Sequence, residues 1–195
     1  VNIDGSNDID LTPFENIQAR IEDDLENDPD YMLVSLNKRD PRIHDVYRLN
    51  INDGALTLIA ENPGNIMGWM TDNDGKLRIA TTSDGVNTSL LYRDSEEQSF
   101  EPILTTNFKE SVSPLYFTFD NKSLYVSSNR GRDKSAIYKF DLNTAKETDL
   151  IFEHNEVDVY GLMRSEKRKI ITGVTYTTDK RQIKFFDKWR ENLQK

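Results

Sequence analysis

The sequence contains no cysteine, only two histidines and no long apolar run. Without cysteine the chain cannot form a disulfide, a thiolate nucleophile or a zinc site with sulfur ligands. No apolar run approaches the roughly 20 residues that cross a bilayer as a helix, and no signal-peptide pattern opens the sequence. We therefore expect no membrane partner, and the compartment stays open between the cytoplasm and a periplasmic or exported location.

Basic residues are outnumbered, with 25 lysines and arginines against 34 acidic residues and a formal net charge of −9. This acidic balance repels a phosphate backbone, so we expect no nucleic-acid partner. The one local basic group, Arg130, Arg132 and Lys134, is interpreted as a solvated hairpin turn rather than a binding patch.

The chain has 195 residues, which is enough for one sizeable domain or for a slice of a larger one. It begins with Val1 rather than methionine and ends on the polar run WRENLQK. We therefore expect a piece of a longer protein.

Four short apolar segments recur at a nearly constant spacing. They are YMLVS, LRIAT, LYVSS and IITGV, and they begin at residues 31, 77, 124 and 170. Each is followed by a polar turn and a second segment that carries an aromatic residue, at Tyr47, Tyr92, Tyr138 and Phe185. An Asp or Asn closes each second segment, at Asn50, Asp94, Asp141 and Asp187. Two independent features with one period indicate an internal repeat.

Within each unit the pattern predicts four short strands, because apolar and polar residues alternate with a period of two. The second unit divides into strands over 66–72, 77–83, 88–94 and 100–106. The intervening turns, DNDGK, SDGVN and SEEQS, are rich in the residues that adopt left-handed backbone conformations in tight hairpins. The equivalent first strands of the other units are expected over 16–23, 115–120 and 158–164.

A four-stranded meander that repeats at this period is typical of a blade of a β-propeller. One meander has two apolar faces and cannot cover both alone, so successive blades pack side by side. We predict an all-β chain, a partial propeller over 1–195 with blades at about 16–62, 66–106, 115–153 and 158–195. The fourth blade is incomplete, because a tail of helix-forming composition follows its third strand at 181–187. Propellers close with about four to eight blades, so the chain is either a small closed ring or an arc of a larger one.

Catalytic motifs are missing from the sequence. There is no Gly-x-Ser-x-Gly nucleophile elbow and no glycine-rich loop that leads into a helix. His44 has Asp45 beside it, but adjacent strand residues point to opposite faces, so both His44 and His154 are interpreted as turn-edge histidines. We assign no catalytic residue to this chain.

Oxygen-rich stretches at 72–75 (DNDG) and 4–10 (DGSNDID) resemble fragments of a calcium loop. Both lack the late bidentate glutamate, and DNDG falls where a hairpin turn is needed. We therefore assign no metal ligand and no cofactor-binding residue.

Aromatic residues offer a further candidate, a stacking platform built from Trp69, Trp189 and the tyrosines. Trp69 falls on the first strand of a blade, where a large side chain most often packs between blades. The aromatic residues that recur with the repeat are expected to share one packing environment. Both observations favour a structural role over a ligand site.

Several segments together resemble the propeller of prolyl oligopeptidase-family serine peptidases, most closely the bacterial dipeptidyl-aminopeptidase or acylaminoacyl-peptidase type. They are DLTPF at 10–14, LNKRDPRIHDVYRLN at 36–50, ENPGN at 61–65, the run from SPLYF to IYKFD at 113–141, and the run from TGVTY to KFFD at 172–187. The resemblance covers nearly the whole chain, and the order of its segments makes it specific.

This resemblance implies a propeller of seven or eight blades, of which the chain would be an arc, together with a C-terminal α/β-hydrolase domain that carries Ser, Asp and His. In that family the propeller limits access, so that short peptides reach the nucleophile and folded proteins do not. The chain matches the propeller only, so the resemblance implies peptide hydrolysis by the parent and no triad residue here. Preferred substrate residues, and release of dipeptides or of acylated residues, stay open.

Two rival interpretations remain at this point. A TolB-like propeller would present a protein-binding surface and have no enzymatic activity, and a lectin-like propeller would bind a sugar or a metal. A cut between blades also predicts two exposed apolar blade faces, and therefore self-association of the arc.

Overall fold

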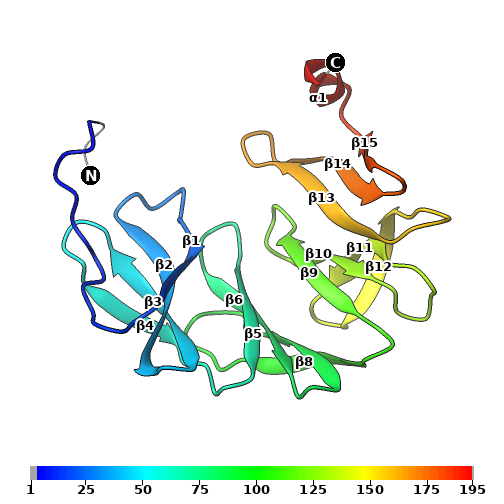
Figure 1. Ribbon diagram of the computed structural model, residues 1–195. Helices are drawn as coiled ribbons and strands as arrows, with labels where there is room; N and C mark the ends of the chain where they lie inside the picture. The colour runs from blue at the N-terminus through cyan, green and yellow to red at the C-terminus, as the bar shows by residue number, and fades with distance from the viewer. Residues whose placement is uncertain (1–3, 195) are drawn as a thin grey trace.

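The computed structural model describes residues 4–194, which form four antiparallel sheets and one short helix. In Figure 1 the sheets stand side by side in an open arc, with the N-terminal segment at one end and the helix at the other. Each sheet is a meander whose spatial strand order follows the chain. The arc is not closed into a ring, so the chain is an arc of blades and the small closed ring is excluded.

The four blades are defined by their strands. Blade 1 contains β1 (Ala19–Asp23), β2 (Tyr31–Asp40), β3 (Ile43–Asn50) and β4 (Leu56–Ala60). Blade 2 contains β5 (Ile66–Thr71), β6 (Leu77–Ser83), β7 (Asn87–Tyr92) and β8 (Glu101–Asn107). Blade 3 contains β9 (Val112–Phe117), β10 (Ser123–Ser128), β11 (Ala136–Asp141) and β12 (Lys146–Phe152). Blade 4 contains β13 (Val159–Ser165), β14 (Ile170–Thr177) and β15 (Arg181–Phe185).

Most predicted strands are confirmed, and the largest correction concerns the first strand of blade 3. It was expected over 115–120 but lies at Val112–Phe117, because the next residues form a turn. In that turn the Asp120 carboxylate accepts the Thr118 hydroxyl at 2.6 Å, and Asn121 adopts φ 57°. Short polar side chains of this kind bond to their own backbone and end a strand.

The tail is ordered as a helix rather than as an outer strand. Helix α1 (Lys188–Leu193) begins after β15, and its N-cap residue Asp187 accepts the Trp189 N–H. The same carboxylate forms an ion pair with Arg168 in the turn between β13 and β14. Blade 4 therefore has three strands where the other blades have four, as predicted.

Each pair of neighbouring blades shares one apolar core. Blades 1 and 2 bury Leu25, Leu33, Val46 and Leu77. Blades 2 and 3 bury a larger set: Ile79, Leu90, Val112, Phe117, Leu124, Val126, Phe140 and Leu142. Blades 3 and 4 bury Ile137, Val159, Leu162 and Val174. Burial of one such aliphatic side chain contributes about 1.5–3 kcal/mol, so contacts between blades are a main source of stability.

The free face of blade 1 is not bare. Its residues Val34, Leu36 and Leu49 are buried, and the N-terminal segment packs Leu11, Phe14 and Ile17 against them. The expectation of an exposed apolar face at this end of the arc is therefore wrong, because the chain covers that face with its own preceding segment.

Strand register defines equivalent positions in the four blades. One hydroxyl residue recurs on each second strand: Ser35, Thr81, Ser127 and Thr175. The residue opposite it on the third strand is always aliphatic: Val46, Leu90, Ile137 and Ile183. The row of aliphatic residues supplies the inter-blade cores, since three of its four members belong to them.

The same register corrects the interpretation of the recurring aromatic residues. Tyr47 and Tyr138 follow the aliphatic residue by one position, whereas Tyr92 and Phe185 follow it by two. Successive strand residues point to opposite faces. The four aromatic residues therefore divide between the two blade faces and do not share one environment.

Candidate functional site

The turns between the first and second strands of the blades gather on the inner side of the arc (Figure 1). Direct contacts join them from blade to blade. The Thr71 hydroxyl of blade 2 donates to the Asp23 carboxylate of blade 1. The backbone N–H of Asn73 donates to Asn121 Oδ1 of blade 3 at 3.0 Å. These bonds join residues 48 positions apart, so the repeat itself brings the partners together.

Asn73 is the centre of this arrangement. Its Nδ2 donates to the Thr118 carbonyl at 2.8 Å and to Asn121 Oδ1 at 2.6 Å. Its Oδ1 accepts from Arg164 Nη1 of blade 4 at 3.2 Å. Arg164 also lies over the Tyr116 ring, with its guanidinium carbon 4.0 Å from the ring centre. One amide side chain thus links three of the four blades.

A buried ion pair supports the turn that carries Asn73. Asp72 and Arg78 are joined at 3.1 Å, and their side chains are 5% and 10% exposed. The other Asp72 oxygen accepts the backbone N–H groups of Asp74 and Lys76. Arg78 also donates to the Tyr92 hydroxyl at 2.5 Å. Burial lowers the pKa of Arg78, but its hydrogen bonds to Asp72 and Tyr92 and its electrostatic interactions with these two groups outweigh burial, so this pKa is raised.

The long connection of blade 1, residues 24–30, lies over the neighbouring turn of blade 2. Its Leu25 is 5% exposed and inserts into the core between blades 1 and 2. Leu25 fits only because residue 75 is glycine, since a Cβ at Gly75 would lie 2.5 Å from Leu25 Cδ2. Gly75 also has φ +69°, a conformation that favours glycine.

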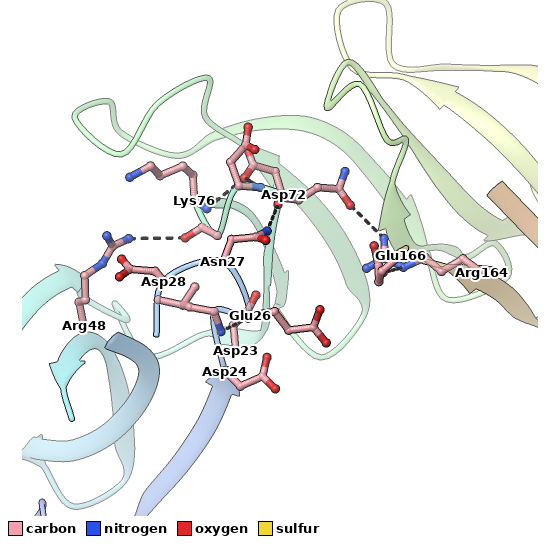
Figure 2. Close-up of a pocket in the computed structure, with 14 residues that line it drawn as sticks. Asp23, Asp24, Glu26, Asn27, Asp28, Arg48, Asp72, Lys76, Arg164 and Glu166 are labelled. Atoms are coloured by element: carbon pink, nitrogen blue, oxygen red, sulfur yellow. Dashed lines mark hydrogen bonds and ion pairs between the residues drawn. The ribbon is translucent and has the colours of Figure 1, made fainter. Parts of the chain in front are cut away.

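These turns enclose a cavity of about 390 Å³, shown in Figure 2. Seven carboxylates line it: Asp23, Asp24, Glu26, Asp28, Asp72, Asp74 and Glu166. Three cations line it as well: Arg48, Lys76 and Arg164. Asp24 and Glu26 are exposed, and Arg48 donates to the Gly75 carbonyl at 3.5 Å. We refer to this region as the acidic inner cavity.

The chemistry of the acidic inner cavity is electrostatic. Within residues 4–194 no three His, Asp or Glu side chains are arranged so that they could hold a metal ion. The excess of carboxylates creates a negative potential that attracts ammonium or guanidinium groups of a ligand. The cavity can therefore favour cationic groups, and two of its carboxylates, Asp23 and Asp74, accept hydrogen bonds from Thr71 and Asn121 of neighbouring blades.

Neither histidine from the sequence analysis lies at this cavity. His44 is half-buried at the second position of β3, directly after the turn at 41–42, and its Nε2 is shielded from solvent without a hydrogen-bond partner. Burial, and next the charge of Arg20, lowers the pKa of His44. His154 follows β12, and its Nδ1 accepts the Glu156 N–H at 3.1 Å.

The other sequence candidates take structural positions. Trp69 packs on the core between blades 1 and 2, 5.6 Å from the Phe100 ring, as predicted. Trp189 is 59% exposed on α1 and lies under Arg168. DNDG forms the predicted β5–β6 turn.

The basic group at 130–134 lies in the β10–β11 turn, as predicted, but it is not simply solvated. Arg132 pairs with Glu147 at 2.7 Å and lies 4.2 Å from the centre of the Tyr138 ring. The two contacts hold this arginine against the blade.

Sequence reasoning missed Asn73, Asn121 and Arg164 as one group. A signal was present, since Asn73 and Asn121 stand in equivalent turns 48 residues apart. Only the radial arrangement of the blades shows that equivalent turns are neighbours, and nothing in the strand pattern connects Arg164 with residue 73.

The fold and the inner turns together define the chain as an arc of a β-propeller. No family model matches the sequence. Dipeptidyl aminopeptidase BIII of Pseudoxanthomonas mexicana is 33% identical over 163 residues, 79% of this chain and 22% of that protein. Dipeptidyl peptidase family member 6 of Caenorhabditis elegans is 19% identical over 163 residues, 78% of this chain and 22% of that protein.

The 33% identity to dipeptidyl aminopeptidase BIII supports the resemblance drawn from the sequence, to the propellers of prolyl oligopeptidase-family peptidases. The chain spans about a fifth of the length of the curated relatives it matches. Among solved structures, TolB from Acinetobacter baumannii superposes with a TM-score of 0.57 and 16% identity, over 79% of this chain and 37% of that one. This likeness shows the propeller fold alone. No helix within residues 4–194 is long and apolar enough to cross a membrane.

Proposed function

We propose that the chain is the access-limiting propeller segment of a serine exopeptidase or oligopeptidase that cleaves short peptides. The observation that carries the proposal is the 33% identity to dipeptidyl aminopeptidase BIII over most of the chain. On this proposal the partner is a C-terminal α/β-hydrolase domain of the same protein, which supplies the catalytic residues. The segment itself has no catalytic role.

The acidic inner cavity is the part of the segment that we assign to substrate selection. It lies at the inner turns of the arc, where a peptide that passes through a propeller would meet it. Its exposed carboxylates, Asp24 and Glu26, offer a negative field to a peptide amine or a basic side chain. A neutral peptide brings only its α-amine to this field, and a basic side chain adds to the attraction.

The experiment uses the protein encoded by the complete reading frame. Asp24→Asn together with Glu26→Gln removes two charges and keeps side-chain size. We expect kcat/KM to fall about three- to tenfold for peptides with a basic residue, as electrostatic steering predicts, and to fall less for neutral ones, which bring only their α-amine. Glu101→Gln, on the outer strand β8, is the matched control. Equal loss for both peptide classes would remove the selective role of the cavity.

The peptidase assignment has its own test. Pure chain 1–195 is expected to leave peptide p-nitroanilides and simple esters uncleaved, and the complete protein is expected to cleave the former with sensitivity to serine-directed inhibitors. The TolB-like scaffold is the alternative, and the fold likeness to TolB is equally expected of both. A reading frame without a Gly-x-Ser-x-Gly elbow downstream would favour the scaffold.

A further inference from the structure

A second cleft lies between blades 1 and 2, at a place where the blades differ in one residue. The first-strand residue opposite the recurring hydroxyl is Gly68 in blade 2, Ser113 in blade 3 and Gly161 in blade 4. These residues are small. In blade 1 the same position, opposite Ser35, is Arg20.

The strand register determines where Arg20 points. Ser35 pairs with Val46, and Val46 belongs to the core that blade 1 shares with blade 2. Paired residues lie on the same face of a sheet, and so do residues two positions apart on one strand. Arg20 and His44 therefore both lie on the face of blade 1 that turns toward blade 2.

The side chain of Arg20 is exposed, and its guanidinium has no hydrogen-bond or ion-pair partner within residues 4–194. His44 stands near it, because the charge of Arg20 is the second cause, after burial, of the lowered pKa of His44. The Nε2 atom of His44 lacks a hydrogen-bond partner as well. A buried polar atom without a partner, such as His44 Nε2, is uncommon in a folded protein.

Both side chains line a cleft of about 620 Å³. Arg42 lines the same cleft and is paired with Asp40, and Glu22 is its one carboxylate. Ile66, Met67 and Trp69 of blade 2 provide apolar lining, and Met67 is 75% exposed. The cleft thus combines two arginines and a histidine with three apolar residues of blade 2.

The corresponding place between blades 3 and 4 is closed by a direct bond. The Ser127 hydroxyl donates to the carbonyl of Val159 at 2.8 Å. Small residues at this register position allow such a close approach between blades. Blade 1 has a long cation there instead, and the space beside it is open.

We propose that this cleft binds a carboxylate carried on an apolar group, such as the free C-terminus of a short apolar peptide or an aliphatic acid. Arg20 offers two parallel N–H donors to the two carboxylate oxygens of the ligand. The apolar group lies against Met67 and Trp69. This inference does not depend on the proposed peptidase function.

The test uses chain 1–195, whose size suits ¹H–¹⁵N correlation spectra, with three probes: N-acetyl-leucine, its C-terminal amide and hexanoate. We expect N-acetyl-leucine to shift the indole N–H signal of Trp69 and leave that of Trp189, on α1, unchanged. The amide differs by the missing charge and is expected to bind at least about tenfold more weakly. A response to hexanoate alone would identify an aliphatic acid as the ligand. A response to both acids would show that the cleft recognises the carboxylate whichever of the two apolar groups carries it.

Variants complete the test. Arg20→Gln is expected to raise Kd at least about tenfold, whereas Arg181→Gln, an exposed arginine on β15, leaves it unchanged. Arg20→Gly places the residue of blades 2 and 4 at this position, and it is the second variant to be used if the glutamine variant fails to fold. The proposal is overturned if neither acid shifts Trp69, if the amide binds as well as the acid, or if Arg20→Gly binds like the parent chain.

Discussion

Arg39 and Asp45 face each other across the β2–β3 hairpin and form a bidentate ion pair, with Nε to Oδ2 at 2.9 Å and Nη2 to Oδ1 at 2.8 Å. The Asp45 side chain is 1% exposed. Its Oδ1 also accepts the Asn62 N–H, and Arg39 donates to the Asn62 carbonyl, both at 2.8 Å. The pair therefore ties the hairpin to the segment that leads into blade 2. Arg39 and Asp45 both lie in the stretch 36–50 that resembles the peptidase propellers, and the structure gives them a structural role.

The first prediction concerns this pair. The Arg39 side chain is 44% exposed, but Arg39→Met leaves the buried Asp45 carboxylate without its cation, so we expect the free energy of unfolding to fall measurably. Arg42→Met is the matched control, because the Arg42–Asp40 pair is exposed at the arginine and an exposed pair contributes at most about 1 kcal/mol. Urea unfolding measures both. Equal losses would contradict the role assigned to Arg39.

The contribution of this pair to the free energy of unfolding decreases in acid. Burial acts to raise the pKa of Asp45, but the bonds from Arg39 and Asn62 together outweigh burial, so this pKa lies below its ordinary value of 3.8. Stability from the pair is therefore fully present above that value and lost as the pH falls below it. Arg39→Met should make the chain unfold at a higher pH in acid titrations followed by circular dichroism.

The second prediction concerns His44. Its pKa is lowered in the folded chain, so the unfolded chain binds the proton more readily and unfolding becomes easier as the pH falls through the ordinary value of 6.5. The groups that act on His44 are Arg20, Glu22 and Asp45. His44→Gln should flatten the decline in unfolding free energy between pH 7 and pH 5. His154→Gln is the control, and an unchanged slope in His44→Gln would contradict the assignment.

The third prediction tests the glycine of the fourth blade. A Cβ at Gly161 would overlap the Thr175 hydroxyl, whereas one at the equivalent Gly68 would lie 3.1 Å from the Thr81 hydroxyl. Gly161→Ala should therefore cost about 1–3 kcal/mol, because overpacking forces a backbone shift, and Gly68→Ala should cost less. Thermal unfolding of the two variants ranks them. The reverse ranking would show that the contact between β13 and β14 at Gly161 and Thr175 is looser than the structure indicates.

The fourth prediction tests the link between the inner turns. Asn73→Ala removes the side chain that bonds to Thr118, Asn121 and Arg164. We expect a loss of about 1–3 kcal/mol, because partly buried partners are left unsatisfied. Asn143→Ala, at an exposed turn position between β11 and β12, should change stability by less than about 0.5 kcal/mol. Hydrogen exchange should also show faster opening of 118–122 in Asn73→Ala alone.

The outcome of the sequence analysis differed between local and long-range features. The strands at Leu77–Ser83 and Ser123–Ser128 could be located because their alternation and their turns are local properties. The end of β9 was misplaced, because Thr118 and Asp120 form a turn whose side-chain bonds are not visible as hydrophobic alternation. The recurring tyrosines were misassigned, because a change of one position in register moves a side chain to the other face.

The candidate sites show the same division. DNDG could be recognised as a turn, but its contact with Asn121 and Arg164 depends on blades that are far apart in the sequence. Arg20 stood within a predicted strand and drew no attention, because its difference from Gly68 and Gly161 appears only when the strand register is known.

By itself the sequence determined that this chain is built of short strands in four similar units and that each unit needs a neighbour. The reason is that alternation and turn chemistry act over a few residues, and the repeat period can be measured directly as the spacing of the units along the sequence. Only the tertiary structure decided which turns meet at the inner side of the arc, what covers blade 1, and where an arginine lies without a partner. Those outcomes depend on contacts between residues dozens of positions apart, and the radial packing of whole sheets brings these residues together.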